Sequence, residues 1–456
     1  MTLDSFARRL TDALFTTAPM RAVFCDAGRL QGMLDFEAAL ARAEARVGVI
    51  PAAAGEAIAA CCRAADFDTE ALGRDAAAAG NVAIPLVKAL TRRVAHADAE
   101  AARFVHWGAT SQDAIDTGIV LQMRAALDLL DADYARLSAA LAGLAQREAE
   151  TLLAGRTWLQ QALPITLGVK VAGWLSAVER DRTRLAAVRA HALVLQFGGA
   201  AGTLASLEGH GLAVAEALGA ALDLAVPELP WHAQRDRIAE CAAVLGIAVG
   251  TLGKIARDVS LLMQTEIGEA FEPSGAGRGG SSTMPHKRNP VSAAVVLAAA
   301  IRVPPLVATM LAAMVQEHER GLGGWHAEWD TLPEIFGLAA GALAETLRVA
   351  SDLEVDRPRM RANLDITRGL LAAEGVALAL GRTLGKQDAH RLMEAASHRA
   401  VAEQRHLRAV LDEMPEVHAR LDAADLDRLF DPGAATGAAA QWITRVLAAR
   451  TTRHST

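Results

Sequence analysis

Apolar positions along the chain recur mainly with a helical period. From Ser111 to Leu144, leucines and isoleucines recur at roughly helical spacing with little interruption, which predicts one very long amphipathic helix. Three further stretches have the same character, at about 164–196, 231–271 and 290–320. Because helices in globular proteins average about 11 to 12 residues, these lengths predict an elongated bundle.

Shorter helical patterns flank this bundle on both sides. Residues 1–108 contain turn signals such as Gly80-Asn81, and the pattern breaks again after residue 352, around Arg357-Pro358 and Asp431-Pro432. We therefore expect an all-α protein. A central long-helix bundle should occupy residues 109–351, between smaller helical domains at 1–108 and 352–456.

Composition supports this class and argues against several others. Alanine dominates an apolar share of 52%, whereas aromatic residues make up only 4%, a balance that favours helices over sheets. The formal charge of -7, without a long basic block, argues against nucleic acid as a partner. The four cysteines show neither metal-ligand spacing nor a disulfide framework.

The apolar segments do not predict a membrane protein. Residues 1–9 are charged and lack the apolar core of a signal peptide, so we expect a cytoplasmic location. The most apolar stretch, 291–316, is interrupted by Arg302 and Pro304-Pro305. A membrane span requires about 20 predominantly apolar residues, and we interpret this stretch as a buried helix of a large core.

A glycine-rich loop between two of the predicted long helices carries the candidate chemistry. Residues 275–280 include four glycines in six positions, which lowers the cost of unusual backbone angles and predicts a mobile lid. The cationic or potentially cationic residues of the loop crowd around Ser281 and Ser282, just ahead of a helix N-terminus that favours anions; they are Arg278, His286, Lys287 and Arg288. The loop is typical of a carboxylate site, although these features alone are also typical of a solvated connector.

Residues 280–290 resemble the signature of the fumarase/aspartase superfamily, GSSxMPxKxNP, at every specified position. In that family the first serine is the general base, and the lysine and asparagine contact the substrate. The resemblance implies a fumarase/aspartase-like fold in which Ser281 is catalytic and Lys287 and Asn289 bind the substrate, with Met284 beside them.

Three other segments resemble the same superfamily in the same order. Residues 106–117 are similar to its first conserved segment. Thr110 and Asp113 have the spacing of a capping box, and Thr110, Ser111 and Gln112 at a helix N-terminus are typical of a carboxylate cradle. The two interpretations are compatible. Residues 155–168 are similar to GRTHGQxAxPxTxG, which implies substrate contacts from Thr157, Trp158 and Gln160. Residues 198–206 resemble GAxGTxAS, so the likeness extends over nearly the whole chain.

Several departures from the family pattern indicate which branch fits best. Trp158 stands where many family lyases carry a histidine that acts on the leaving group, and Ala294 stands where they place its glutamate partner. Gly80-Asn81 replaces a His-Asp pair, and Trp329 replaces an arginine of the adenylosuccinate lyases. A carboxylate leaving group, with a pKa of about 4, departs as an anion and needs no proton from a histidine. The departures therefore favour the carboxymuconate cycloisomerase branch, in which a carboxylate adds to a double bond.

The resemblance also implies a set of partners. We expect a small tricarboxylate substrate, no cofactor, no metal, and a homotetramer in which three subunits contribute to each site. Arg320 either faces a substrate carboxylate or forms a surface salt bridge. The alternatives are a lyase that splits adenylosuccinate or a related C–N bond, and a non-catalytic homologue like the lens crystallins of this superfamily.

Overall fold

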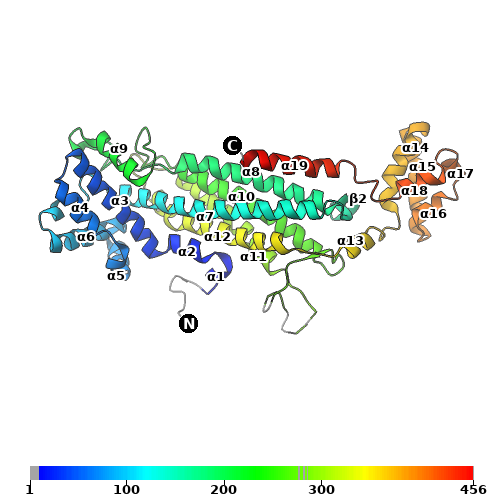
Figure 1. Ribbon diagram of the computed structural model, residues 1–456, viewed down its shortest axis with the longest axis horizontal. Helices are drawn as coiled ribbons and strands as arrows, with labels where there is room; N and C mark the ends of the chain where they lie inside the picture. The colour runs from blue at the N-terminus through cyan, green and yellow to red at the C-terminus, as the bar shows by residue number, and fades with distance from the viewer. Residues whose placement is uncertain (1–9, 276–277, 281–282, 285, 455–456) are drawn as a thin grey trace. The chain divides into compact units, whose positions relative to one another are not determined.

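The computed structural model describes residues 10–275, 278–280, 283–284 and 286–454, except for the side chains of 452–454. The protein is mainly helical (Figure 1), as the sequence predicts. Its longest helices are α7 (Ser111–Arg147), α8 (Leu167–Ala192), α10 (Asp236–Leu262), α11 (Val291–Ala313) and α12 (Gly324–Asp352). The four long helices expected from periodicity are thus confirmed, although α8, α10 and α11 are shorter than the patterns suggested, and α12 was not among them.

The chain forms two compact units, each built from separate stretches of sequence. Unit 1 comprises residues 1–134, 181–253 and 295–344, and unit 2 comprises 135–180, 254–294 and 345–456. The divisions fall inside the long helices, so each unit contains part of every one of them. The three-part division expected from the sequence stays a prediction.

Unit 1 contains the short N-terminal helices. They are α1 (Asp12–Phe15), α2 (Ala18–Phe24), α3 (Asp26–Val47), α4 (Ala52–Ala60), α5 (Thr69–Ala79) and α6 (Ala83–Ala97), with α9 (Gly211–Leu222) against α3 and the 3-10 turns η1 (Ala64–Asp66), η2 (Ala101–Phe104) and η3 (Ala205–Leu207). Glycine allows the closest helix approaches: a Cβ on Gly32 of α3 would lie 2.7 Å from the Gly118 carbonyl oxygen of α7. Small residues therefore fix the spacing between helices here.

Unit 2 contains a β-hairpin that the sequence did not predict. Strands β1 (Leu152–Thr157) and β2 (Gln160–Thr166) pair antiparallel, with Thr157 opposite Gln160 and an irregularity between Ala154 and Arg156. A second short pair joins β3 (Ala270–Phe271) to β4 (Glu354–Val355). Both pairs are short, and the fold class stays all-α.

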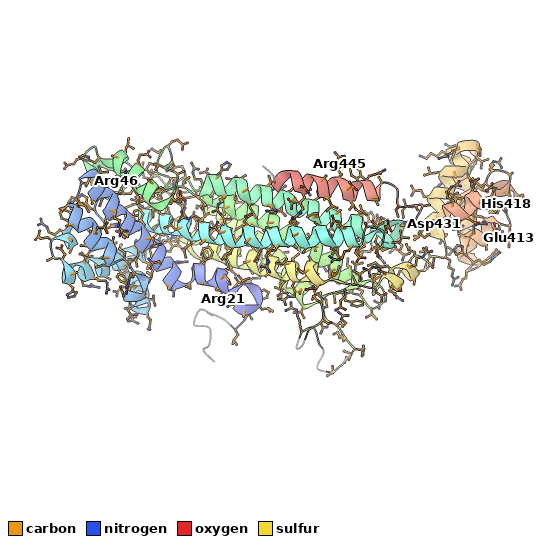
Figure 2. The ribbon with its side chains drawn as sticks, in the orientation of Figure 1. Arg21, Arg46, Glu413, His418, Asp431 and Arg445 are labelled. Carbon is orange, nitrogen blue, oxygen red and sulfur yellow. The ribbon has the colours of Figure 1, made fainter. Side chains whose placement is uncertain are left out.

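The C-terminal part of unit 2 is a set of shorter helices. They are α13 (Arg357–Asn363), α14 (Ala373–Leu384), α15 (Lys386–Ala402), α16 (Leu407–Leu411), α17 (Pro415–His418), α18 (Ala423–Leu429) and α19 (Ala439–His454), with the 3-10 turn η4 (Leu370–Ala372). Helices α14–α18 enclose a core of buried apolar side chains such as Leu380, Met393 and Leu411. Glu413 and His418 lie among these helices (Figure 2), outside the apolar core, and their side chains are partly exposed.

The apolar helix α11 differs from its sequence interpretation. By length and composition alone, α10 and α11 could each cross a membrane, and 61% and 33% of their apolar windows are buried, respectively. The sequence predicts that residues 291–316 form a buried core helix, which is wrong for this chain taken alone. Helix α11 forms, but most of its apolar surface stays uncovered, with Ile301 74% exposed.

Unit 1 also buries an unpaired carboxyl group. Glu44 of α3 is fully buried, and neither side-chain oxygen has a hydrogen-bond partner among the described residues. Burial raises the pKa of Glu44 to about 9, and the nearby Glu37 carboxylate adds to this rise. Glu44 is therefore protonated in the folded protein at neutral pH.

Replacing Glu44 with glutamine should stabilise the protein at high pH. Above a pH of about 4.5 the unfolded chain releases the Glu44 proton while the folded chain keeps it, so stability falls as pH rises from there to about 9. Glutamine has the shape of protonated glutamate but does not titrate. Glu44→Gln should therefore add roughly 3 to 5 kcal/mol to the free energy of unfolding at pH 8 and almost nothing near pH 4.5. Urea unfolding at both pH values tests this, with the exposed Glu56→Gln as control; an equal effect of Glu44→Gln at both pH values contradicts it.

Candidate active site

The N-terminus of α7 is held by one buried carboxylate. Asp113 Oδ2 accepts hydrogen bonds from the backbone N–H groups of Thr110 (3.0 Å) and Gly199 (2.9 Å). Its Oδ1 lies 2.7 Å from His232 Nε2 and accepts the N–H of Gly198 at 3.0 Å. The expected contact between Thr110 and Asp113 is confirmed, and the same carboxylate joins the 106–117 and 198–206 segments.

The glycines of the 198–206 segment allow this close approach. Gly199 has a φ of +69°, and a Cβ there would lie 2.9 Å from the Gly108 carbonyl oxygen. A Cβ on Gly198 would lie 2.8 Å from the His232 ring. The two glycines are therefore needed so that consecutive backbone N–H groups reach Asp113.

Gln112 and Arg320 meet within unit 1. Gln112 is fully buried, and its Oε1 accepts a hydrogen bond from Arg320 Nε at 2.9 Å. Arg320 Nη2 donates to the Ala200 carbonyl at 3.1 Å. Arg320 lies between α11 and α12, where the Glu317 carboxylate accepts the Leu322 N–H at 2.8 Å. Within the described part of the chain, the hydrogen bonds of Arg320 thus go to neutral oxygens rather than to a surface carboxylate.

Trp158 occupies a strained hairpin tip in unit 2. Trp158 and Leu159 connect β1 to β2 with φ values of +53° and +64°. Positive φ at both central residues is what a type I′ turn requires, and such turns favour Asn-Gly. The left-handed conformation costs a non-glycine residue about 1 to 2 kcal/mol. The Trp158 side chain is nonetheless 97% exposed, so strain and exposure coincide at a predicted site residue.

An ion pair supports the base of this hairpin. Arg156 of β1 donates two hydrogen bonds, of 2.8 and 2.7 Å, to the buried carboxylate of Glu269. Asn363 Nδ2 donates to the same carboxylate at 2.8 Å, while Gln161 of β2 donates to the Asn363 carbonyl at 2.9 Å. Both strands are thereby anchored, with the Thr157, Trp158 and Gln160 side chains exposed at the tip.

The signature loop is described only in part. Ser281 and Ser282 lie outside the described residues, so the predicted role of Ser281 is untested. The Asn289 N–H donates to the Gly279 carbonyl at 2.8 Å, and the Lys287 N–H donates to the Met284 carbonyl at 3.0 Å. The Lys287 side chain is exposed.

Two arginines of this loop pair with protein carboxylates. Arg278 contacts Glu345 and donates to Ser292 Oγ at 2.8 Å. Arg288 donates to Glu354 Oε2 at 2.7 Å, and this contact lowers the pKa of Glu354 to about 2. The sequence suggested that all four cations of the loop form a carboxylate address. In the structure both arginines hold the loop to the protein through carboxylates, whereas the exposed Lys287 and His286 side chains form no such ion pair among the described residues.

Within the described parts of the chain, no three histidine, cysteine, aspartate or glutamate side chains gather as a metal-ligand set. The candidate residues offer hydrogen-bond donors instead: backbone N–H groups, the Gln112 amide and the Arg320 guanidinium in unit 1, and the Lys287 ammonium in unit 2. Such a set can bind carboxylates and stabilise negative charge that develops in a reaction.

Comparisons with known proteins cover nearly the whole chain. Residues 14–304 match a family model described as Lyase, and residues 369–446 match one described as Adenylosuccinate lyase C-terminus. A 3-carboxy-cis,cis-muconate cycloisomerase of Pseudomonas aeruginosa is 61% identical over 98% of this chain and 97% of its own length.

The chain belongs to the fumarase/aspartase superfamily of lyases.

Other members of the superfamily share both sequence and fold. The crystal structure of 3-carboxy-cis,cis-muconate lactonizing enzyme from Pseudomonas putida superposes with a TM-score of 0.93 at 56% identity, covering 97% of this chain and 99% of that one. A nitrosuccinate lyase of Streptomyces davaonensis is 44% identical over 94% of this chain and 92% of its own length. The relatives of this chain thus include proteins named as lyases as well as cycloisomerases.

Several residues that hold the candidate segments in place were not singled out as such in the sequence. Asp113 was assigned only to a helix cap, although it joins two conserved segments. Arg156 and Glu269, which support the hairpin, lie 113 positions apart, so no local pattern could connect them. The sequence does carry one signal for Asp113, because an acidic residue three positions after Thr110 fits the capping-box pattern.

Proposed function

We propose that this enzyme is a 3-carboxy-cis,cis-muconate cycloisomerase, which adds a substrate carboxylate across a double bond to give 4-carboxymuconolactone. The observation that carries the proposal is 61% identity to a protein of that name over nearly the full length of both chains. Trp158 at the hairpin tip supports it, because tryptophan cannot protonate an amine or hydroxide leaving group. The reaction belongs to the protocatechuate branch of the β-ketoadipate pathway of aromatic catabolism.

In the proposed mechanism, a carboxylate oxygen attacks the alkene carbon that carries the 3-carboxyl group, closing a five-membered lactone. The electron pair of the double bond moves toward the neighbouring carbon and its carboxylate, producing an enolate-like dianion. That carbon then takes one proton, so the reaction is an isomerisation without loss of atoms. Because nucleophile and alkene belong to one molecule, binding in the folded conformation supplies much of the proximity effect.

The proposed roles of the site residues follow from where the charge develops. Ser281 donates the proton in lactonisation and removes it in reverse. Lys287 and Asn289 stabilise the dianion, assisted by Met284 packing within the same loop. The unit 1 residues Thr110, Ser111, Gln112 and Arg320 form the carboxylate cradle, and the hairpin residues Thr157, Trp158 and Gln160 contact the substrate.

We further propose a cytoplasmic homotetramer in which three subunits contribute to each site. The exposed apolar surface of α11 supports an assembly, because an apolar face of that size is costly to leave in water. A monomer in sedimentation experiments contradicts this part of the proposal.

The rival functions are a C–N lyase of the adenylosuccinate type and a non-catalytic homologue. The similarity to a nitrosuccinate lyase is the reason to test the lyase alternative directly. The purified protein should be incubated separately with 3-carboxy-cis,cis-muconate and with adenylosuccinate. We expect the diene absorbance to fall in the first reaction and no fumarate in the second; fumarate release without muconate loss overturns the proposal, and inactivity in both favours the non-catalytic homologue.

A further inference from the structure

Two hydrogen bonds from the side-chain nitrogen of Gln112 determine the orientation of its amide group. Gln112 Nε2 donates to Asp116 Oδ2 at 3.0 Å and to the His232 carbonyl at 2.8 Å. Both partners are acceptors, so the amide cannot be reversed without losing two hydrogen bonds. Its Oε1 must therefore point toward the Nε–H of Arg320.

Asp116 is in turn fixed by buried donors. Arg235 donates to its two oxygens at 2.7 and 3.2 Å, and Trp325 Nε1 donates to Oδ1 at 2.9 Å. The other edge of Arg235 pairs with the Glu328 carboxylate. Burial alone lowers the pKa of Arg235, but Asp116 and Glu328 raise it above its ordinary value. Arg235 is therefore a permanent cation that holds Asp116 in one position.

Arg320 keeps one edge for a ligand. Its Nε and Nη2 contact Gln112 and Ala200, and Nη1 has no protein partner among the described residues. A guanidinium held in one orientation binds a planar carboxylate with less loss of freedom than a mobile one.

We propose that Asp116 is a positioning residue for substrate binding, acting through the Gln112 amide on the guanidinium of Arg320. The inference deepens the proposed function, because it rests on the role of Arg320 in binding a substrate carboxylate. Asp116 itself is buried with 1% exposure and acts on the substrate only through these two side chains.

Asp116→Asn and Glu328→Gln form a matched pair of variants. Each removes one carboxylate from Arg235 and leaves it the other, but only Asp116 contacts Gln112. The amide introduced by Asp116→Asn has an N–H that can face Gln112 Nε2, which removes one of the two hydrogen bonds that orient the Gln112 amide and leaves only the one to the His232 carbonyl. We expect Asp116→Asn to raise KM for 3-carboxy-cis,cis-muconate about tenfold at nearly unchanged kcat, and Glu328→Gln to leave both near wild type. Equal changes in the two variants overturn the proposal.

A double-mutant cycle separates positioning from general destabilisation. In an Arg320→Ala background, Asp116→Asn should have no further effect on KM, whereas independent, additive effects contradict the proposal. Binding of the unreactive probe propane-1,2,3-tricarboxylate should show the same pattern by calorimetry. If wild type binds the probe with this coupling but does not convert the muconate, the proposed function fails and the positioning role stands. Probe binding that Asp116→Asn does not weaken overturns the role itself.

Discussion

Ser281→Ala is expected to lower kcat for lactonisation roughly 10²- to 10⁴-fold, the usual range for loss of a general acid or base. KM should change far less, because the hydroxyl acts on the proton rather than on the bound carboxylates. Steady-state rates in both directions measure the effect, since one group serves both by microscopic reversibility.

The neighbouring serine supplies the control for this prediction. Ser282→Ala alters the same loop by the same atom and should cause a much smaller loss. If Ser281→Ala turns over like wild type, the serine has no part in the chemistry. If both variants lose activity equally, the effect belongs to the loop as a whole.

Lys287→Met is expected to lower kcat roughly 10²- to 10³-fold, the range seen when one donor to a developing oxyanion is lost. Methionine keeps most of the length of the side chain but removes the charge that stabilises the dianion. The loss should fall on kcat more than on KM, because this charge develops only during the reaction. A change confined to KM assigns Lys287 to ground-state binding instead.

His286→Asn is the matched control for Lys287, because it removes the other potentially cationic side chain of the loop that has no carboxylate partner among the described residues. It should retain most of the wild-type activity, whereas a loss as large as that of Lys287→Met indicates that the overall loop charge matters.

The long helices could be predicted from the sequence because their signal is local. Helix α7 begins at Ser111, as the periodicity of its leucines and isoleucines indicates. The hairpin of residues 152–166 was not predicted because its two strands are short and its turn carries Trp158-Leu159 instead of a glycine. Burial of α11 was also mispredicted, because apolar composition does not say whether the same chain covers a helix.

The site residues stay predictions, and the sequence indicated only part of the contacts that the structure gives them. Arg278 and Arg288 look like ligand-binding cations in the sequence, whereas their carboxylate partners Glu345 and Glu354 lie more than sixty positions away. Gln112 likewise depends on Arg320, which lies 208 positions away, as well as on Asp116 in the next turn of α7. Motifs thus identify the segments, and tertiary contacts decide which side chains remain available.

Product analysis in D₂O is the most direct measurement of the central claim that a carboxylate and one proton add across the same double bond. We predict that NMR of the reaction of 3-carboxy-cis,cis-muconate will show 4-carboxymuconolactone with a single deuterium on the carbon beside the free acetate carboxylate. Unchanged substrate, or a product without solvent deuterium at that carbon, contradicts the account.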